Sequence, residues 1–282
     1  MKKRLISLIL IGLSGLVLAQ EASTNRPERL VRYSFTLTNQ KGDFIPDAEL
    51  WVRLPVQQTS GQTFLSYKAS YPCELIPGKD GNQTLRFQFK SYPPYARKIV
   101  RIEARTLVGS EPAETDIEPS VYLGSAKFME LDSPEFKKLA PHFGNGKPDR
   151  IAHTVMNWMK QNVQDAGYLK RDHGALYALT EKKGDCTEQA YLFAALCRVH
   201  NIPARVLGGY VTQGNAVLGP LGYHNWVEFY DGNHWQTADP QRGVFAEKGG
   251  EYTALCIADD EGPLTDTARF KVKGEGLTAK MN

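Results

Sequence analysis

The residues most able to do chemistry in this 282-residue chain are one cysteine, one histidine and one aspartate, in that order. Cys186 precedes a strongly apolar stretch, and His224 and Asp239 follow on two predicted strands separated by Asp231-Gly232. A thiol nucleophile, an imidazole base and a carboxylate that orients the imidazole are the parts of an acyl-transfer site. No other part of the sequence supplies a comparable set.

The cysteine is expected at the start of a buried helix. Residues 187–200 are apolar on almost every face after the first turn, which is typical of a helix buried on all sides. Asp185 suits the N-cap, Glu188 completes a capping-box pattern, and Pro203 cannot continue the helix. Cys186 would then meet unpaired backbone N–H groups and the positive end of the helix dipole, which favour a thiolate. Taken alone, it could equally be a small inert residue.

The histidine and the aspartate are expected on one face of a hairpin. Asp231-Gly232 favours a two-residue turn, which sets His224 directly opposite Asp239. Side chains paired in this way have Cβ atoms about 5 Å apart, close enough for a carboxylate to hold the imidazole N–H. A three-residue turn that includes Asn233 would shift the register by one. Each residue also has a structural explanation alone, but the coincidence of all three predicts a catalytic set.

These segments closely resemble the bacterial transglutaminase-like superfamily, the papain-related fold of transglutaminases and microbial thiol hydrolases. The resemblance runs from about residue 179 to residue 243 and rests on the segments Gly184-Asp-Cys-Thr-Glu188, Asn201-Ile-Pro-Ala-Arg205, Val206-Leu-Gly-Gly-Tyr-Val211, His224-Asn-Trp-Val-Glu228 and Trp235-Gln-Thr-Ala-Asp-Pro240. It implies Cys186 as nucleophile, His224 as base and Asp239 as the residue that orients the base. Many relatives have Ala-Trp after the histidine, where this chain has Asn225-Trp226.

The resemblance implies an α+β, papain-like transglutaminase core with an antiparallel sheet. Relatives act as cross-linkers, peptidases or deamidating hydrolases, so the implied function is an enzyme that forms a cysteine thioester from peptide or glutamine carboxamide groups. The alternative is a non-catalytic envelope binding or assembly module that retains the fold. The backbone N–H of Cys186 is the oxyanion donor that a helix start offers. Trp158 and Tyr177 are candidate oxyanion side chains.

The chain is expected to form two domains after its N-terminal segment. Four short runs alternate between apolar and polar residues and predict an all-β sandwich over residues 26–108: Leu30–Thr38, Glu49–Leu54, Leu85–Phe89 and Ile99–Ala104. A polar, proline-containing linker is predicted at 109–120, and the transglutaminase-like catalytic domain at 121–282. The glycine-rich segment 213–222 is either a flap over the site or a plain surface loop.

Residues 1–19 have the pattern of a secretory signal peptide. Lys2-Lys3-Arg4 precedes an apolar run over residues 5–18, and small residues lead up to Ala19. We therefore expect cleavage near Ala19-Gln20 and a periplasmic or secreted protein; a retained N-terminal anchor is the alternative. The rest of the chain has no apolar run long enough to cross a membrane.

Charge and cysteine usage exclude several other classes. Without the three basic residues of the signal, basic and acidic residues balance, which argues against nucleic acid. The resemblance and the export signal together imply a protein or peptide of the cell envelope as the partner. The cysteines lack zinc-type spacing, and no metal or cofactor is expected. Cys197 is expected to be a buried thiol. Cys73 and Cys256 then remain as candidates for a disulfide, whose pairing the sequence leaves open.

Overall fold

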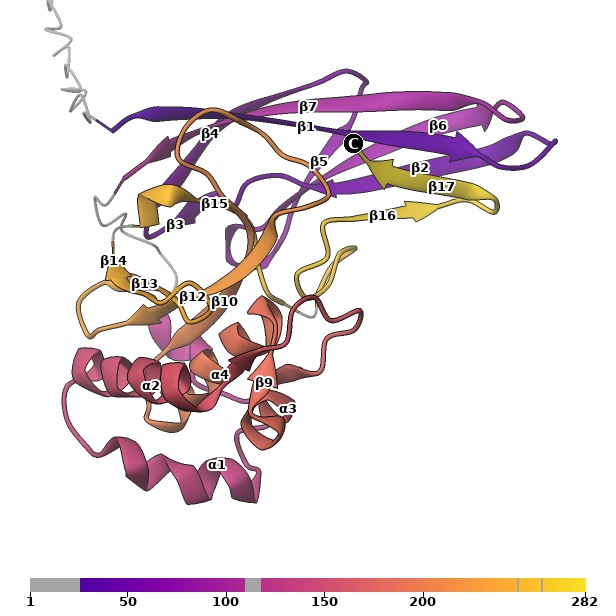
Figure 1. The fold of residues 1–282 in the computed structure, drawn as a ribbon. Coiled ribbons are helices and arrows are strands. Elements are labelled where there is room, and N and C mark those ends of the chain that lie inside the picture. Colours follow the sequence, from indigo (N-terminus) through magenta and orange to yellow (C-terminus); the bar gives the residue numbers. More distant parts are fainter. Residues whose placement is uncertain (1–25, 110–117, 248, 260) are drawn as a thin grey trace, which may run out of the picture.

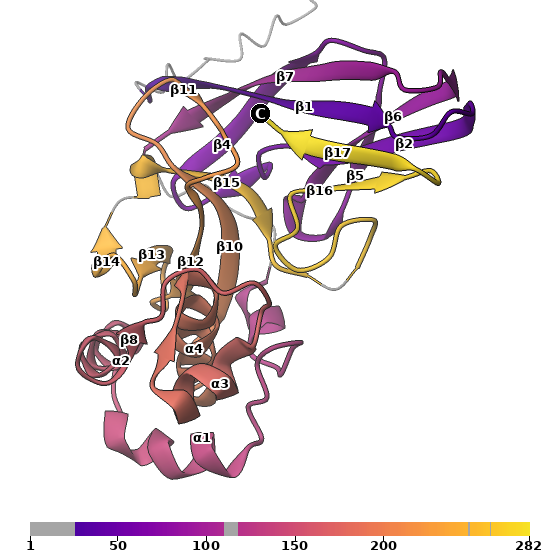
Figure 2. The ribbon, with the colours of Figure 1, turned by 45° about the vertical axis from the view of Figure 1, so that its right-hand side comes forward.

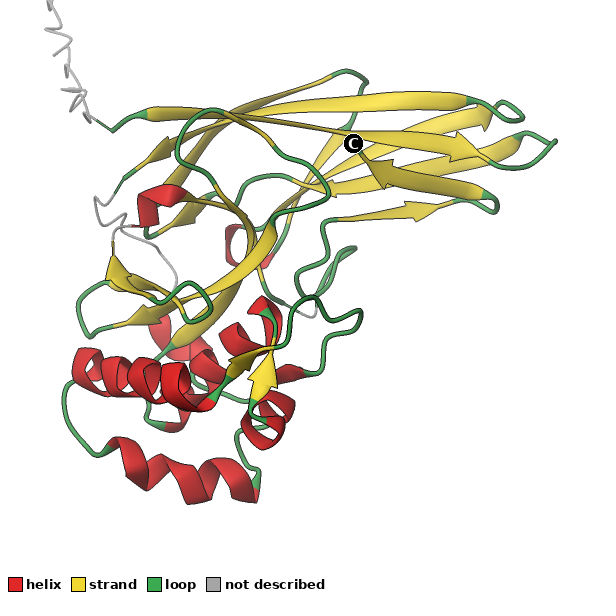
Figure 3. Cartoon of the chain, in the orientation of Figure 1, coloured by secondary structure: helices red, strands yellow, loops and turns green. Residues whose placement is uncertain are grey.

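The computed structural model describes residues 26–109, 118–247, 249–259 and 261–282. The predicted signal peptide, residues 1–19, lies outside these ranges, as do residues 110–117 of the predicted linker. In the described ranges a strand-rich N-terminal part is followed by helices and then by further strands, as Figure 1 and Figure 3 show. The expected α+β class with antiparallel sheets is confirmed.

The N-terminal strands form a sandwich of two sheets whose apolar faces meet. The first sheet has the order β11-β1-β7-β4-β3, with β17 also paired to β1, and the second has the order β16-β2-β6-β5. On β1, Tyr33, Phe35 and Leu37 alternate into the core between the sheets, which explains the alternating pattern in the sequence. The N-terminal strands are β1 (Glu28–Asn39), β2 (Ile45–Arg53), β3 (Gln58–Thr59), β4 (Gln62–Ala69), β5 (Glu74–Pro77), β6 (Gln83–Tyr92) and β7 (Arg97–Val108), with the short helix η1 (Lys79–Gly81) before β6.

The C-terminal residues complete this sandwich, contrary to the expected domain division. β16 (Phe270–Lys273) pairs with β2, and β17 (Leu277–Met281) pairs with β1. Figure 1 shows the C-terminus beside β1. Residues 270–281, which we assigned to a catalytic domain spanning 121–282, therefore belong to the sandwich. A short alternating run indicates a strand without indicating its partner, and the boundary error follows from that.

One helix is surrounded on all sides and organises the other half of the molecule. This helix, α4 (Cys186–Val199), packs against α2, α3 and the strands β10 and β12, and residues 187–198 are all buried. The buried helix expected with Asp185 as its N-cap and Cys186 at its first position is therefore confirmed, and it ends at Val199. The remaining helical elements are η2 (Pro119–Tyr122), α1 (Pro134–Leu139), η3 (Ala140–Phe143), α2 (Pro148–Asn162) and α3 (Gly174–Glu181); β8 (Gln164–Asp165) and β9 (Lys183–Gly184) form a short parallel pair.

A five-stranded antiparallel sheet of order β14-β13-β12-β10-β15 connects the helices to the sandwich. Figure 2 shows β10 running from α4 up to the sandwich. Val206 of β10 lies in the core around α4, whereas Tyr210 of the same strand lies in the sandwich core. The sheet contains β10 (Ala204–Val211), β12 (Tyr223–Tyr230), β13 (Trp235–Asp239), β14 (Val244–Glu247) and β15 (Tyr252–Ile257), with β11 (Ala216–Val217) and the short helix η4 (Gly249–Glu251) in its connections. No helix in the described ranges is long and apolar enough to cross a membrane.

Candidate active site

The start of α4 holds Cys186 at its first position. Asp185 is the N-cap, and its Oδ1 accepts the backbone N–H of Thr187 at 2.8 Å. Glu188 Oε2 in turn accepts the backbone N–H of Asp185 at 3.3 Å, so the predicted capping box is confirmed. Glu188 is fully buried, and this burial raises the pKa of its carboxyl to about 7 although the His173 backbone N–H also binds it. Cys186 itself stays partly exposed.

The hairpin that carries the histidine and the aspartate has a different register from the one expected. Tyr230 pairs with Trp235, so the connection spans the four residues 231–234 and the expected two-residue turn is wrong. The cause is the Asp231 carboxylate, whose Oδ1 accepts the backbone N–H groups of Asn233 at 2.8 Å and His234 at 2.9 Å, as in an Asx-turn. The register shifts by two residues, and an even shift keeps each side chain on its original face.

His224 and Asp239 consequently remain neighbours, diagonally across the hairpin. Nε2 of His224 lies 2.6 Å from Oδ2 of Asp239, and both residues are buried. Cys186 lies close enough to the same imidazole to raise its pKa, and Nδ1 is the ring nitrogen that Asp239 leaves available. Burial lowers the pKa of His224, but the hydrogen bonds and charges of Asp239 and Cys186 raise it by more, to about 9. The structure thus brings together all three predicted site residues.

Two further residues, missed by sequence reasoning, hold the carboxylate of Asp239. The hydroxyl of Tyr252 donates to Asp239 Oδ2 at 2.9 Å, and the backbone N–H of Arg242 donates to Oδ1 at 3.1 Å. The guanidinium of Arg242 also donates to the Tyr252 hydroxyl at 2.9 Å. Tyr252 begins a strand outside the motifs that carry the resemblance, so no local signal in the sequence could have found it.

Asn225, the departure from the family pattern, joins the two halves of the site. Its Oδ1 accepts the hydroxyl of Thr187 at 3.2 Å, and its Nδ2 donates to the carbonyl of Leu207 at 3.1 Å. Thr187 follows Cys186 on α4, and Asn225 follows His224 on β12. The side chain therefore fixes the start of the helix to the strand that carries the histidine.

Cys186 borders a cleft of about 790 Å³. Its walls come from three connections: residues 168–172 before α3, residues 220–222 before β12, and residues 265–269 before β16. Tyr168 and Leu221 lie on two of these walls and are each 88% exposed. Large apolar side chains that remain so exposed beside a nucleophile are typical of a binding surface.

The segment 213–222 is tied down rather than free to act as a flap. Its strand β11 pairs with β1, and Leu218 is buried in the sandwich core. The carbonyl of Gly219 accepts the hydroxyl of Tyr210 at 2.7 Å, and the carbonyl of Pro220 accepts Nη1 of Arg269 at 3.0 Å. These contacts favour the surface-loop interpretation and hold Leu221 at the cleft.

The two candidate oxyanion side chains lie elsewhere. Trp158 packs edge-on against Phe143 and under the ammonium group of Lys182, and Tyr177 stacks on His173 with ring centroids 4.6 Å apart. Neither Trp158 nor Tyr177 lines the cleft. The backbone N–H of Cys186 stays the predicted oxyanion donor.

The other three cysteines occupy separate environments, and all four thiols are free. Cys197 is buried within α4, where burial raises the pKa of its thiol. Cys256 is also buried, and its Sγ lies 3.5 Å from the hydroxyl of Tyr223, whereas Cys73 packs against the sandwich core. The structure therefore does not pair Cys73 with Cys256.

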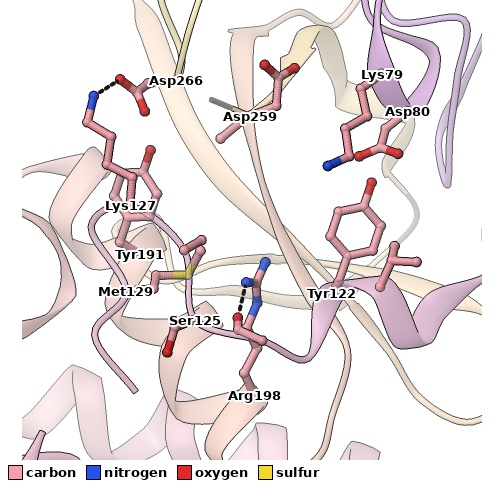
Figure 4. Close-up of a pocket in the computed structure, with 14 residues that line it drawn as sticks. Lys79, Asp80, Tyr122, Ser125, Lys127, Met129, Tyr191, Arg198, Asp259 and Asp266 are labelled. Carbon is pink, nitrogen blue, oxygen red and sulfur yellow. Dashed lines mark hydrogen bonds and ion pairs between the residues drawn. The ribbon is translucent and has the colours of Figure 1, made fainter. Parts of the chain in front are cut away.

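A smaller cavity of about 190 Å³ lies between α4 and the sandwich (Figure 4). Cys186, His224 and Asp239 do not line it. Its charged groups are largely engaged within the protein: Lys127 pairs with Asp266 at 2.6 Å, and Arg198 donates to the carbonyl of Gly124 at 2.7 Å. The candidate active site is therefore the larger cleft at Cys186.

Comparison with known proteins finds one family model that matches the part of the chain holding this site. Residues 137–240 match the model of the transglutaminase-like superfamily, and the chain contains a transglutaminase-like domain. The match begins at α1 and ends just after Asp239, so it covers all three predicted site residues. No curated protein matches the chain.

A solved structure shares the fold at low sequence identity. A proposed cysteine protease from Cytophaga hutchinsonii superposes with a TM-score of 0.65 at 18% identity, covering 92% of this chain and 91% of that chain. The periplasmic domain of TgpA from Pseudomonas aeruginosa gives a TM-score of 0.42 at 15% identity, covering 75% of this chain and 88% of that chain. The first similarity spans nearly the whole chain, and it therefore extends to the sandwich as well as to the core.

Proposed function

We propose that this protein is a thiol acyl-transfer enzyme that acts on peptide bonds or glutamine carboxamide groups. The observation that carries the proposal is the placement of Cys186 at the wall of an open cleft, beside an imidazole that Asp239 binds. The thiol is partly exposed, whereas the imidazole and the carboxylate behind it are buried. The nucleophile can reach a substrate while its charge partners stay shielded from water.

The proposed reaction proceeds in two halves. His224 takes the proton of the Cys186 thiol before the substrate reacts, because its raised pKa favours the imidazolium, and the thiolate of this ion pair attacks the carbonyl carbon to form a C–S bond. The backbone N–H of Cys186 stabilises the developing oxyanion. The C–N bond then breaks as the imidazolium protonates the leaving amine or ammonia. Water or an amine next attacks the thioester, His224 accepts its proton, and the C–S bond breaks to restore the thiol.

Asp239 serves this reaction by holding the imidazole. Its Oδ2 binds Nε2 of His224, which fixes the ring orientation and leaves Nδ1 available to the thiol. The negative charge also stabilises the imidazolium that exists in both halves of the reaction, consistent with a pKa of His224 raised to about 9 by its two partners.

The cleft supports a polypeptide as substrate. The cleft, with a volume of about 790 Å³ and walls from three connections, accommodates an extended segment of chain. Tyr168 and Leu221 offer apolar contacts to a side chain near the reacting carbonyl. The signal-peptide pattern of residues 1–19 supports export, so the proposed location is the periplasm or the exterior, and the proposed substrate is a protein of the cell envelope.

Mass spectrometry of envelope proteins incubated with the enzyme and a labelled primary amine tests the proposal. Amine incorporation indicates transamidation, conversion of glutamine to glutamate indicates deamidation, and new termini indicate proteolysis. We expect one of these changes with the wild type and with Cys73→Ala, which alters a thiol outside the cleft, but not with Cys186→Ala. If none of the three changes depends on Cys186, the protein is a binding module that retains the fold.

A further inference from the structure

We propose that Tyr252 and Arg242 form a positioning pair that tunes the proton affinity of His224 by way of Asp239. The inference rests on the proposed function for its use in catalysis, but its test needs no turnover. Neither residue lines the cleft at Cys186, so neither is placed to touch a substrate there. Both act through the carboxylate that holds the imidazole.

The hydrogen bonds form a continuous sequence from the guanidinium to the imidazole. Nη1 of Arg242 donates to the hydroxyl of Tyr252 at 2.9 Å, and this hydroxyl donates to Oδ2 of Asp239 at 2.9 Å. The same Oδ2 lies 2.6 Å from Nε2 of His224. One carboxylate oxygen therefore accepts hydrogen bonds from both the tyrosine and the histidine, and the two donors compete for the same acceptor.

The sandwich fixes the tyrosine in this position. Arg29 of β1 is buried and donates to the carbonyl of Gly250 at 2.6 Å and to the carbonyl of Tyr252 at 3.5 Å. The ring of Tyr252 packs against Trp226 with centroids 4.8 Å apart. A rigid backbone and a packed ring leave the hydroxyl little freedom, and its direction toward Asp239 is set by the fold.

The sign of the effect follows from the shared oxygen. A hydroxyl that donates to Oδ2 withdraws charge from the oxygen that faces His224, and the nearby guanidinium strengthens that donor. Without the hydroxyl, Oδ2 serves the imidazolium alone, so the charged form of His224 gains stability and its pKa rises. Removing the positive charge of Arg242 acts in the same direction.

The titratable and charged groups around His224 come from several elements. Cys186 faces it from α4, Asp239 from the end of β13 and Tyr252, by way of Asp239, from β15. Arg242 lies in the turn after β13, and Glu251 faces Arg242 at 4.0 Å. The carboxylate of Glu251 moderates the charge of Arg242, so Arg242→Gln is expected to shift the His224 titration less than Tyr252→Phe does.

The decisive experiment follows the imidazole by NMR. The imidazole signal of His224 is assigned by its absence in His224→Gln. Its titration is then measured in the full-length mature protein, in Tyr252→Phe, in Arg242→Gln and in Tyr230→Phe. Tyr230→Phe is the matched control. It also removes a tyrosine hydroxyl from this sheet, but the ring of Tyr230 packs against Trp235. We expect Tyr252→Phe to raise the pKa of His224 by roughly half a unit to one unit, Arg242→Gln to raise it less, and the control to leave it unchanged.

A second readout is the rate at which iodoacetamide alkylates Cys186 as a function of pH. The upper inflection of this profile should move upward in Tyr252→Phe together with the NMR titration. A merely structural role would lower reactivity or stability without moving either inflection. An unchanged or lowered pKa of His224 in Tyr252→Phe, while the protein still unfolds cooperatively, overturns the inference; if Tyr252→Phe does not fold, Arg242→Gln decides it. Absence of turnover in the wild type would count against the proposed function and leave this titration readable.

Discussion

The two regions that meet at the active site are positioned in different ways. Cys186 is placed by its immediate neighbours, because the N-cap Asp185 and the capping-box residue Glu188 both lie within the same short segment. His224 and Asp239 are placed by other strands and by the sandwich, since Tyr252 of β15 binds Asp239 and Arg29 of β1 binds the carbonyl of Tyr252. The nucleophile thus depends mainly on the start of one helix, which Asn225 links to β12, whereas the base and its carboxylate depend on the assembled sheet and sandwich.

The hairpin is fastened to the sandwich by a buried charge pair. Arg205 of β10 donates to Oε2 of Glu228 of β12 at 2.7 Å, and both side chains are almost fully buried. Oε1 of Glu228 accepts the backbone N–H of Ser60 at 2.8 Å and its hydroxyl at 2.6 Å, and Ser60 lies between β3 and β4. A side chain on the adjacent Gly61 would come within 2.4 Å of the backbone of Gly249, so only glycine permits this approach.

The largest effect is expected from the carboxylate itself. Asp239→Asn keeps the size of the side chain but permits the wrong imidazole tautomer, and we expect activity to fall by about 10⁴-fold, the scale seen for a triad aspartate. Steady-state kinetics on the substrate found by mass spectrometry measure the loss. Asp47→Asn, at an exposed sandwich position, is the control and should be fully active. Near-normal turnover in Asp239→Asn would show that the carboxylate, and the hairpin that places it, does not contribute to catalysis.

The second prediction tests how far the hairpin depends on tertiary contacts. Glu228→Gln leaves Arg205 as a buried charge without its partner, and we expect a loss of about 3–5 kcal/mol in the free energy of unfolding. Urea denaturation followed by circular dichroism measures it. Glu103→Gln removes the partner of Arg32 in an exposed pair and should change stability little. If the two variants lose equal stability, the buried pair does not fasten the hairpin.

The third prediction concerns pH. The pKa of His224 is raised from 6.5 to about 9 in the folded protein, so its charged form stabilises the fold fully below pH 6.5. This contribution is lost as the pH rises from 6.5 through 9, and it amounts to on the order of 3 kcal/mol. The free energy of unfolding of the wild type, measured from pH 6 to 10, should therefore fall more steeply than that of His224→Gln. Parallel curves for the two proteins would show that the folded site does not favour the imidazolium.

The difference between local and long-range placement also explains which features the sequence could predict. The capping box and the apolar helix after Cys186 are set by nearby side chains, and both are present as expected. The hairpin register depends on hydrogen bonds from the Asp231 side chain that compete with the two-residue turn. The contact between His224 and Asp239 survived that error because the shift was even. The roles of Tyr252 and of the C-terminal strands depend on long-range pairing, which short sequence patterns do not encode.

The smallest loss of stability is expected when the N-cap at the start of α4 is removed. Asp185→Ala removes the acceptor for the backbone N–H of Thr187 and for that of Leu169, which Oδ2 binds at 2.9 Å. Loss of an N-cap costs about 1 kcal/mol, well below the loss expected for Glu228→Gln. Ser133→Ala is the matched control, because Ser133 caps α1 by accepting the N–H of Phe136 at 3.4 Å, away from the cleft.

Both cap variants should lose similar stability in urea, but only Asp185→Ala should slow the alkylation of Cys186. The reason is that Asp185 also holds the connection at Leu169, which lines the cleft beside the thiol. Equal alkylation rates in the two variants would mean that the burial of α4 alone fixes the thiol, and that the cap contributes stability without positioning. Cys186 would then depend on tertiary packing as His224 does, and the contrast between the two regions would disappear.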